Sequence, residues 1–272
     1  MQNKHFNLKR FCNALLFDLK LNKNKYLYFI LSLILVLFLI NIYDIYDTAH
    51  MIINPDYIHK FEERDYIPIF YSTMFIGFVI TTGTSFPLLR HKKSTIHYLM
   101  QPTSTLEKFL IQFLIRVISF AFLFTPIFWL EFKFAAYLYN LYAEQSILIE
   151  NFDLFTPFTF LNNNKFNGLV ICFLISIATF LFTCGTHFKK KVFPKSIFSL
   201  VLFILLLLVF LMIGTSIFYP EKFDYKEQPI YFNNYRISKE ISFAHIFLYF
   251  LSIIVIMFSI PLAYFKLKEK EL

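Results

Sequence analysis

The residues whose types and spacing carry a specific signal lie between Arg90 and Lys108, in the stretch RHKKSTIHYLMQPTSTLEK. Ser104 and Glu107 stand three positions apart, just before a long apolar run. At this spacing the serine hydroxyl accepts a hydrogen bond from the N–H of residue 107, and the carboxylate accepts one from the N–H of residue 104. The pair therefore predicts a new helix after a break at Pro102.

The motifs of common enzyme chemistry are missing from the sequence. Its five glycines leave no place for G-x-x-x-x-G-K-[ST], so we do not expect the chain to hydrolyse ATP itself. H-E-x-x-H and G-x-S-x-G do not occur either. Glu62 and Glu63 stand beside Arg64 in a polar segment, where a solvated charge cluster is more typical than an acid–base pair. We expect no catalytic residue and no cofactor bound by this chain.

Histidines and cysteines do not have metal-ligand spacing. His91 and His97 are six positions apart, which places them on different faces of a helix. The cysteines number three, contain no C-x-x-C pair and avoid the external segments, so neither a metal site nor a disulfide framework is expected; they are Cys12, Cys172 and Cys184.

The composition is that of a membrane protein. Hydrophobic residues make up 57% of the 272-residue chain, and 39 residues are phenylalanine. Runs of about 20 apolar residues are long enough to cross about 30 Å of hydrocarbon as helices. We predict one all-α domain over residues 1–272 with six transmembrane helices, at Tyr26–Tyr43, Tyr66–Leu89, Phe109–Phe132, Phe166–Phe188, Ile197–Tyr219 and Phe243–Phe265.

The first 25 residues predict a helix that lies on the membrane surface. Phe11, Leu15 and Leu19 are four apart and form an apolar stripe opposite lysines. A cleaved signal peptide is the alternative, and it is disfavoured because the following apolar run is too long and lacks a small-residue cleavage site.

The distribution of basic residues predicts both termini in the cytosol. With the N-terminus inside, 17 of the 26 lysines and arginines lie on the cytosolic side, and 14 of the 18 acidic residues lie on the outer side. The net charge of +8 is therefore a topology signal, with anionic lipids as partners, and it does not indicate nucleic-acid binding.

Arg116 is the ionisable residue placed well inside a predicted span, about two turns into the third. Two interpretations are open. The side chain either extends to the cytosolic surface or faces the interior of the bundle as a functional cation. No carboxylate falls at the centre of a span, which disfavours a proton-coupled carrier.

The segment from Tyr98 to Phe109 resembles a motif of the type-2 ATP-binding-cassette (ABC-2) permeases of bacteria. That family joins its second and third spans with a segment like Y-L-x-L-P-A-S-x-x-E-K-F, which here reads Tyr98-Leu99-x-x-Pro102-x-Ser104-x-x-Glu107-Lys108-Phe109. Gln101 and Thr103 depart from it, since the family favours an apolar residue and alanine at these positions. The order of surface helix, six spans and short charged tail is similar too.

The resemblance implies the membrane subunit of an exporter in the bacterial cytoplasmic (inner) membrane. A separate cytosolic ATPase would bind ATP, and the subunit would pair with a second copy or a second permease. Residues 90–108 would be the coupling segment that docks on the ATPase. The residues expected to carry this coupling are Ile96, Tyr98, Leu99, Met100, Pro102, Ser104, Glu107 and Lys108.

Two other functions fit the sequence. A membrane anchor that recruits a cytosolic partner without transporting anything would explain the scarcity of polar groups within the spans. A secondary carrier is a weaker alternative, because the two halves of the chain show no visible inverted similarity.

Overall fold

A computed structural model of the chain describes residues 6–50, 60–61, 63–90, 95–96, 98, 100–142, 148–149, 165–188, 191–218, 236–238 and 241–270. The protein is all-α within these residues, apart from two short strand pairings. β1 (Lys60–Phe61) pairs in parallel with β2 (Leu148–Ile149), and β3 (Arg236–Ser238) pairs antiparallel with β4 (Ile241–Ser242).

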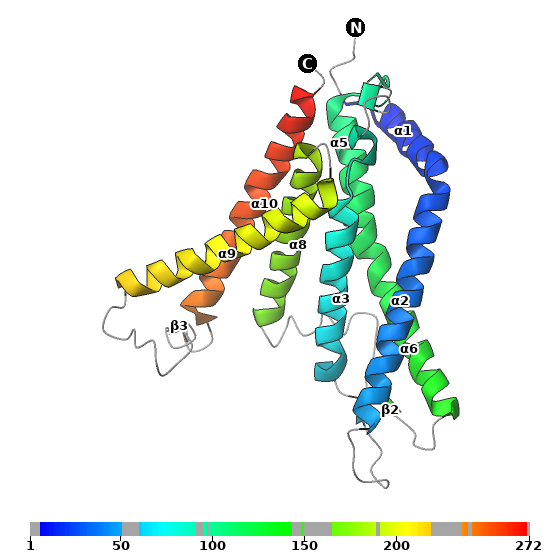
Figure 1. Cartoon of the computed structure of the whole chain (residues 1–272), viewed down its shortest axis with the longest axis vertical. Coiled ribbons are helices and arrows are strands. Elements are labelled where there is room, and N and C mark those ends of the chain that lie inside the picture. The colour runs from blue at the N-terminus through cyan, green and yellow to red at the C-terminus, as the bar shows by residue number, and fades with distance from the viewer. Residues whose placement is uncertain are drawn as a thin grey trace. The chain divides into compact units, whose positions relative to one another are not determined.

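Six helices of the described part are long and apolar enough to cross a membrane (Figure 1). This confirms the predicted number of spans and identifies a multi-pass membrane protein. The spans lie at Lys23–Asp47, Tyr66–Gly83, Thr105–Tyr142, Gly168–His187, Val192–Phe210 and Phe247–Glu269.

The chain is grouped into two compact units. The first comprises Met1–Gly77 and Pro102–Asn163, and the second comprises Phe78–Gln101 and Asn164–Leu272. The chain passes from the second unit back to the first between Gln101 and Pro102, within the predicted coupling segment. The single domain expected from the sequence stays a prediction.

The first unit begins with α1 (Leu8–Leu21), which Asn22 ends, and continues directly into α2 (Lys23–His50). It also contains most of α3 (Glu63–Gly83), and then α5 (Thr105–Phe113), the π-helical turn η2 (Leu114–Ile118) and α6 (Ser119–Tyr142). The last three form one continuous helix, which extends beyond Phe132, the predicted end of the third span. The helical conformation of α1 agrees with the sequence, whereas its position on a membrane surface stays a prediction.

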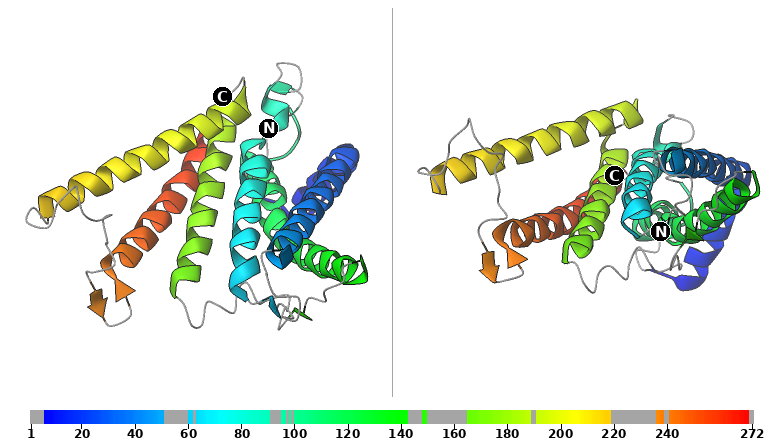
Figure 2. Two further views of the ribbon diagram at one scale, coloured as in Figure 1. Left: turned by 60° about the horizontal axis from the view of Figure 1, so that its bottom comes forward. Right: turned by 90° about the horizontal axis from the view of Figure 1, so that it is seen from below.

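Aromatic rings form the core of the first unit. α2 and α6 run in the same direction, because Phe29 lies against Phe120 and Phe38 against Phe134, with ring centroids 6.3 and 5.8 Å apart. α2, α3 and α6 lie side by side in both views of Figure 2. At Gly77 of α3, an added Cβ would collide with the ring of Phe120, so the absence of a side chain permits this close packing.

The second unit is built on α8 (Lys165–His187), α9 (Val192–Phe218) and α10 (Phe243–Glu269). α8 and α10 lie side by side (Figures 1 and 2). Their C-terminal ends lie together, because Lys270 Nζ donates a hydrogen bond to the carbonyl oxygen of Thr186. α8 and α9 also contact each other, since Phe180 and Phe203 stack with centroids 5.0 Å apart. Between Val201 and Ile213, most of the described side chains of α9 are exposed.

The second span ends earlier than the sequence predicts. α3 stops at Gly83, and the expected continuation to Leu89 is wrong, because the chain turns and forms the 3₁₀ helix η1 (Pro87–Arg90) instead. Phe86 has φ 51°, a left-handed conformation that is strained for a bulky residue. Pro87 explains the break, since a proline disfavours the α conformation in the residue before it.

The remaining boundaries differ from the prediction mainly by extension. α9 begins at Val192 rather than Ile197, with Pro194 in its first turn, where a proline costs no hydrogen bond. Pro126 and Pro261 lie inside α6 and α10 without ending either helix.

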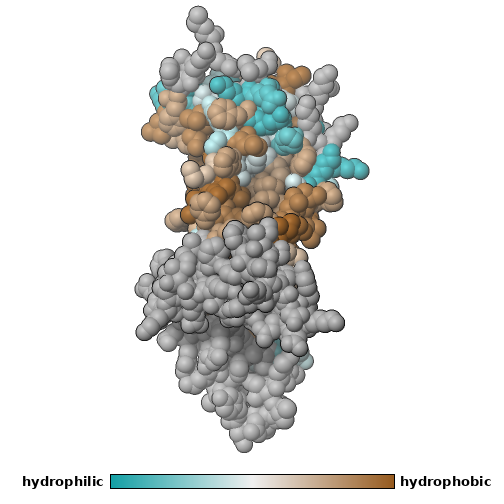
Figure 3. Space-filling view, turned by 90° about the vertical axis from the view of Figure 1, so that its left-hand side faces the viewer, coloured by the Kyte–Doolittle hydropathy of each residue, from teal (hydrophilic) through white to brown (hydrophobic). Residues whose placement is uncertain are grey.

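Apolar side chains cover much of the surface of the described residues. On the face seen in Figure 3 they form a broad band, while hydrophilic residues gather towards the top of the view. A band of this kind is expected where helices contact hydrocarbon, since lipid tails impose no penalty on exposed leucine or phenylalanine.

Candidate functional site

Glu107 occupies the start of α5 as the capping-box spacing predicts. Ser104 is the N-cap, and its Oγ accepts a hydrogen bond from the N–H of Glu107 at 3.3 Å. The carboxylate Oε2 accepts one from the N–H of Ser104 at 2.9 Å. Two N–H groups that have no partner within the helix are thereby satisfied, which fixes where the third span begins.

The same carboxylate also holds the N-terminal helix. Arg10 of α1 donates from Nε to Oε2 at 2.7 Å and from Nη2 to Oε1 at 2.6 Å, a bidentate pair. The N–H of Asn7, the N-cap of α1, donates to Oε1 at 2.9 Å. We call Asn7, Arg10, Ser104 and Glu107 the clamp. One carboxylate therefore closes the first turns of two helices that lie 97 residues apart in the chain.

The clamp pairs a buried charge with a partly exposed one. The side chain of Glu107 is 0% exposed and that of Arg10 is 22% exposed. The hydrogen bond to Glu107 raises the pKa of Arg10 above its usual value. Four donors satisfy the carboxylate, which is the condition under which a buried charge is tolerated.

The sequence predicted Glu107 as a residue of the ATPase-docking surface. Its carboxylate is instead directed at Arg10, so any part it takes in coupling would be to hold α1 against α5. Lys108 is likewise buried, with 2% of its surface exposed. Neither side chain is placed to meet a cytosolic protein directly.

The earlier half of the coupling segment has a different character. The N–H of Met100 donates to the carbonyl of Ile96 at 2.9 Å, which closes a helical turn. Ile96 is 50% exposed and Met100 is 76% exposed, whereas Tyr98 between them is buried. These two apolar side chains are therefore available to a partner. Leu99, also predicted to carry the coupling, lies outside the described residues.

The bend between these halves includes the remaining predicted residue. Pro102 is exposed and lies in a non-helical bend, followed by the buried Thr103 and the N-cap Ser104. The predicted helix break at the proline is confirmed.

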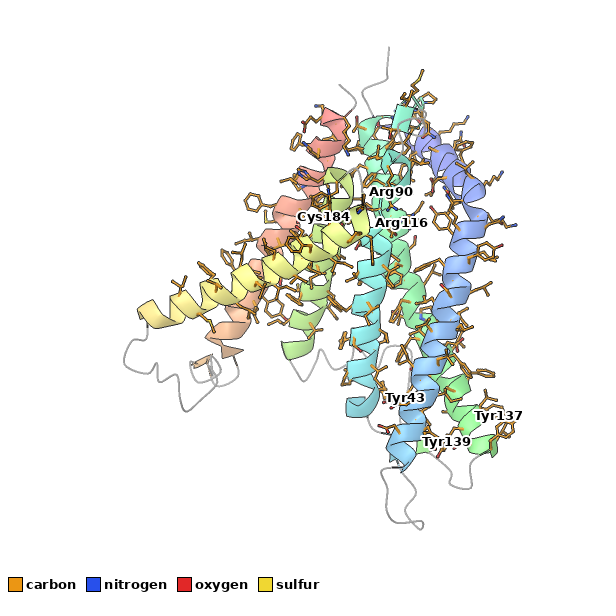
Figure 4. All side chains as sticks on the ribbon, in the orientation of Figure 1. Tyr43, Arg90, Arg116, Tyr137, Tyr139 and Cys184 are labelled. Carbon is orange, nitrogen blue, oxygen red and sulfur yellow. The ribbon has the colours of Figure 1, made fainter. Side chains whose placement is uncertain are left out.

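Arg116 lies in η2, where the hydrogen bonding of the third span changes to the π pattern. Its guanidinium carbon is 5.8 Å from the centroid of the Tyr26 ring, a cation–π contact. Tyr26 in turn donates from its hydroxyl to Asp18 Oδ2 at 2.7 Å. Arg116 Nε is buried and has no hydrogen-bond partner among the described residues. Figure 4 labels the residue in the upper part of the view, while Tyr43, Tyr137 and Tyr139 lie towards the other end of the first unit.

Sequence reasoning did not find Arg10 or Gln112. Arg10 was treated as one of several basic residues of a surface helix, because nothing local distinguishes it from Lys9. Gln112 is 3% exposed, and its Oε1 accepts no hydrogen bond from any described residue. Its position four residues before Arg116 and four after Lys108 was a usable signal, since this spacing places all three on one helix face.

The described residues contain no group of three or more His, Cys, Asp or Glu side chains that could hold a metal ion. No protein-family model, curated protein or solved structure matches the chain.

Proposed function

We propose that the chain is the membrane-spanning permease subunit of an ABC exporter of the type-2 (ABC-2) class. ATP would be bound and hydrolysed by a separate cytosolic ATPase, and the subunit would work in a pair, as a homodimer or with a second permease. Both termini and the coupling segment would face the cytosol of a bacterium, with the spans in its cytoplasmic (inner) membrane.

The observation that carries this proposal is the exposure of Ile96 and Met100. They lie in the short connection between the second and third spans and follow the basic residues Lys92 and Lys93 in the sequence. Exposed apolar side chains on a helical turn suit a groove on a soluble partner better than they suit water. The motif that continues from Tyr98 to Phe109 is the one that resembles the ABC-2 permeases.

The clamp suggests how movement of the segment would reach the membrane helices. The segment is joined by Gln101–Thr103 to the capped start of α5, and the clamp attaches α1 to that same start. A displacement of residues 96–100 would therefore be passed along the chain to α5 and, through Glu107, to α1. Rigid-body rocking of helices is the kind of motion such a connection would drive.

A non-transporting anchor is the second candidate, and the scarcity of charged residues inside the spans favours it. It would use the same exposed turn to recruit a partner. The two functions differ in one consequence: a transport phenotype should be lost when the ATPase's own catalytic carboxylate is replaced, whereas an anchoring phenotype should survive.

The proposal is tested by purifying the tagged chain from its own membranes and measuring nucleotide hydrolysis in the isolated complex. We expect a nucleotide-hydrolysing partner that is lost from Met100→Asp and retained by Tyr142→Asp. Tyr142 is a matched control because it is 87% exposed, at the far end of α6. Equal retention of the partner by both variants would exclude Met100 from the docking surface.

A further inference from the structure

We propose that Lys108, Gln112 and Arg116 bind the anionic headgroup of a lipid-like cargo, at the end of the third span where α5 begins. This proposal deepens the exporter function and rests on it, because it names the class of molecule that the subunit would move. We call these three residues the basic stripe.

The spacing places the basic stripe on one face of a single helix. The residues are four apart, which is just over one helical turn, and eight residues span about 12 Å along the axis. The stripe therefore runs from the first turn of α5 into η2. Lys108 and Gln112 are among the buried residues of α5, so the face is directed at neighbouring helices rather than at lipid.

The two acids that lie near Arg116 and the start of α5 among the described residues accept hydrogen bonds from other groups. Glu107, the nearest acid in the sequence, accepts its hydrogen bonds from the clamp. Asp18 accepts from the hydroxyl of Tyr26, while Arg116 meets the ring of that tyrosine. An arginine within a membrane span without an opposing acid is costly, and such residues usually serve a ligand path.

Two polar atoms of the basic stripe are buried without a partner. Among the described residues, Oε1 of Gln112 accepts no hydrogen bond and Nε of Arg116 donates none. Buried polar groups are normally paired, so these two atoms indicate a ligand that supplies both an acceptor and a donor. A phosphate oxygen would accept from Arg116, and a hydroxyl or ammonium group of the same headgroup would donate to Gln112.

The backbone at Arg116 is unusual as well. η2 replaces the normal α pattern over five residues, and single π-helical turns inside α-helices occur frequently at functional sites. No glycine or proline lies within η2 to account for it, since its sequence is LIRVI.

A lipid phosphate fits this position better than a free phosphate ion. Transfer of a free multivalent anion into a span would require the loss of its hydration, which is very unfavourable. An amphiphile avoids most of that cost, because its acyl chains remain in hydrocarbon and its headgroup moves along a face that already carries two cations. The proposal therefore commits to an amphiphile with a phosphate headgroup.

The test uses the full-length chain in phosphatidylcholine nanodiscs that contain a diazirine-labelled phosphatidylglycerol as the probe. Labelling of the peptide that contains residues 105–118 is followed as the fraction of the probe rises. We expect saturation in the wild type, and about tenfold weaker binding in Arg116→Gln, as for loss of a charge-assisted hydrogen bond. Gln112→Leu should weaken binding less, and diazirine-labelled phosphatidylcholine should not saturate.

Lys133→Gln is the matched control, because Lys133 is a cation of the same continuous helix whose Nζ lies 4.3 Å from the centroid of the Trp129 ring. It should bind the probe as the wild type does. Wild-type saturation in both Arg116→Gln and Gln112→Leu would overturn the proposal. If Arg116→Gln does not fold, as judged by helicity and gel filtration, Arg116→Lys and Gln112→Leu decide the result.

Inorganic phosphate serves as the competitor that separates a lipid from a free anion. We expect no displacement, and displacement at millimolar phosphate would contradict a lipid headgroup site. The assay needs no ATPase, so it is independent of the exporter role. If the probe binds in an Arg116-dependent way but no nucleotide-hydrolysing partner is found, the lipid site is supported and the exporter function is contradicted. If a partner is found but Arg116 does not affect binding of the probe, the exporter function is supported and the lipid site is contradicted.

Discussion

The two units of this protein pack their helices in different ways. In the first, α6 carries phenylalanines at every fourth position, and they meet aromatic residues of α3: the rings of Phe70 and Phe128 lie 5.1 Å apart at 81°, and those of Tyr66 and Phe132 lie 5.5 Å apart. The buried phenylalanines of α6 are Phe120, Phe124, Phe128 and Phe132. Edge-to-face and offset ring pairs of this kind are favourable beyond the area they bury.

The second unit also has ring pairs, such as Phe86 with Phe182 at 5.0 Å, but its helix contacts depend in addition on small and hydroxyl-bearing residues. Thr183 of α8 donates to the carbonyl of Ser259 in α10 at 2.9 Å, and Ser85 donates to the carbonyl of Phe182 at 3.3 Å. At Gly185 an added Cβ would collide with the side chain of Ser85, so the backbones approach closely there. Small residues and interhelical hydrogen bonds are the usual means of joining helices in lipid.

The two units thus meet the same physical requirement for helix association in different ways. Lipid tails are as apolar as leucine, so the hydrophobic effect does not drive helices together within the bilayer, and association depends on close packing and hydrogen bonds. Aromatic rings hold helices together through their large contact area, whereas small residues allow the helix backbones to approach closely. Removing a ring should therefore lower the free energy of unfolding more than removing a hydroxyl group does.

The largest effect is expected from Phe124→Ala. Phe124 is fully buried and contacts the rings of Phe70 and Phe120, both with centroids 5.5 Å away. The cavity should lower the free energy of unfolding by about 3 kcal/mol, at the low end of the range for phenylalanine in soluble proteins because the transfer contribution is smaller in lipid. Steric trapping in bicelles measures this. Phe122→Ala, at an 82% exposed position of the same helix, is the control and should change little.

Gly185→Ala should have the next largest effect. The new methyl group would displace Ser85 and its hydrogen bond to Phe182, at a cost of about 1–2 kcal/mol. Adding Ser85→Gly should restore part of the loss, which a double-mutant cycle on unfolding free energies would detect. Gly83→Ala, where the nearest atom belongs to Phe193 at 3.3 Å, should cost less. Strict additivity at residues 85 and 185 would argue against the close approach.

Glu107→Gln tests the clamp. The variant keeps an acceptor oxygen but loses the charge that holds Arg10, so the N–H groups of Asn7 and Ser104 should exchange with solvent about tenfold faster. Hydrogen–deuterium exchange with peptide-level mass spectrometry measures this. Lys20→Gln, on the exposed part of α1, is the control. Unchanged exchange at residue 7 would mean that α1 is held by other contacts.

Thr183→Val should have the smallest effect, about 0.6 kcal/mol, the mean for an interhelical hydrogen bond in a membrane protein. Thr125→Val is the matched control, because Thr125 donates to Ala121 of its own helix at 3.3 Å. Thermal unfolding in detergent would rank the two variants. A loss at Thr183 equal to that of Phe124→Ala would contradict the comparison between the units.

Much of the fold was predictable, because hydropathy and the spacing of Ser104 and Glu107 depend on residues close in sequence. The exceptions arise from interactions that the sequence does not display locally. The Arg10–Glu107 pair joins positions 97 residues apart. The early end of α3 is different, because Pro87 is a local signal that hydropathy alone does not take into account. The π pattern around Arg116 has no glycine or proline to announce it. The sequence therefore predicts the pairing of Ser104 with Glu107, but it does not predict that Arg10 binds the same carboxylate.

Site-specific photo-crosslinking in native membranes would show whether the turn at residues 96–100 contacts an ATPase. A photoreactive amino acid is placed in turn at Ile96, Met100 and, as the control, Tyr142, and each cross-linked product is identified by mass spectrometry. We expect positions 96 and 100 to capture a protein that hydrolyses nucleotides, and position 142 not to capture it. The proposed docking on an ATPase would be contradicted if neither position captured such a protein. It would be contradicted further if cysteines introduced at positions 96 and 100 reacted with an impermeant thiol reagent added outside intact cells.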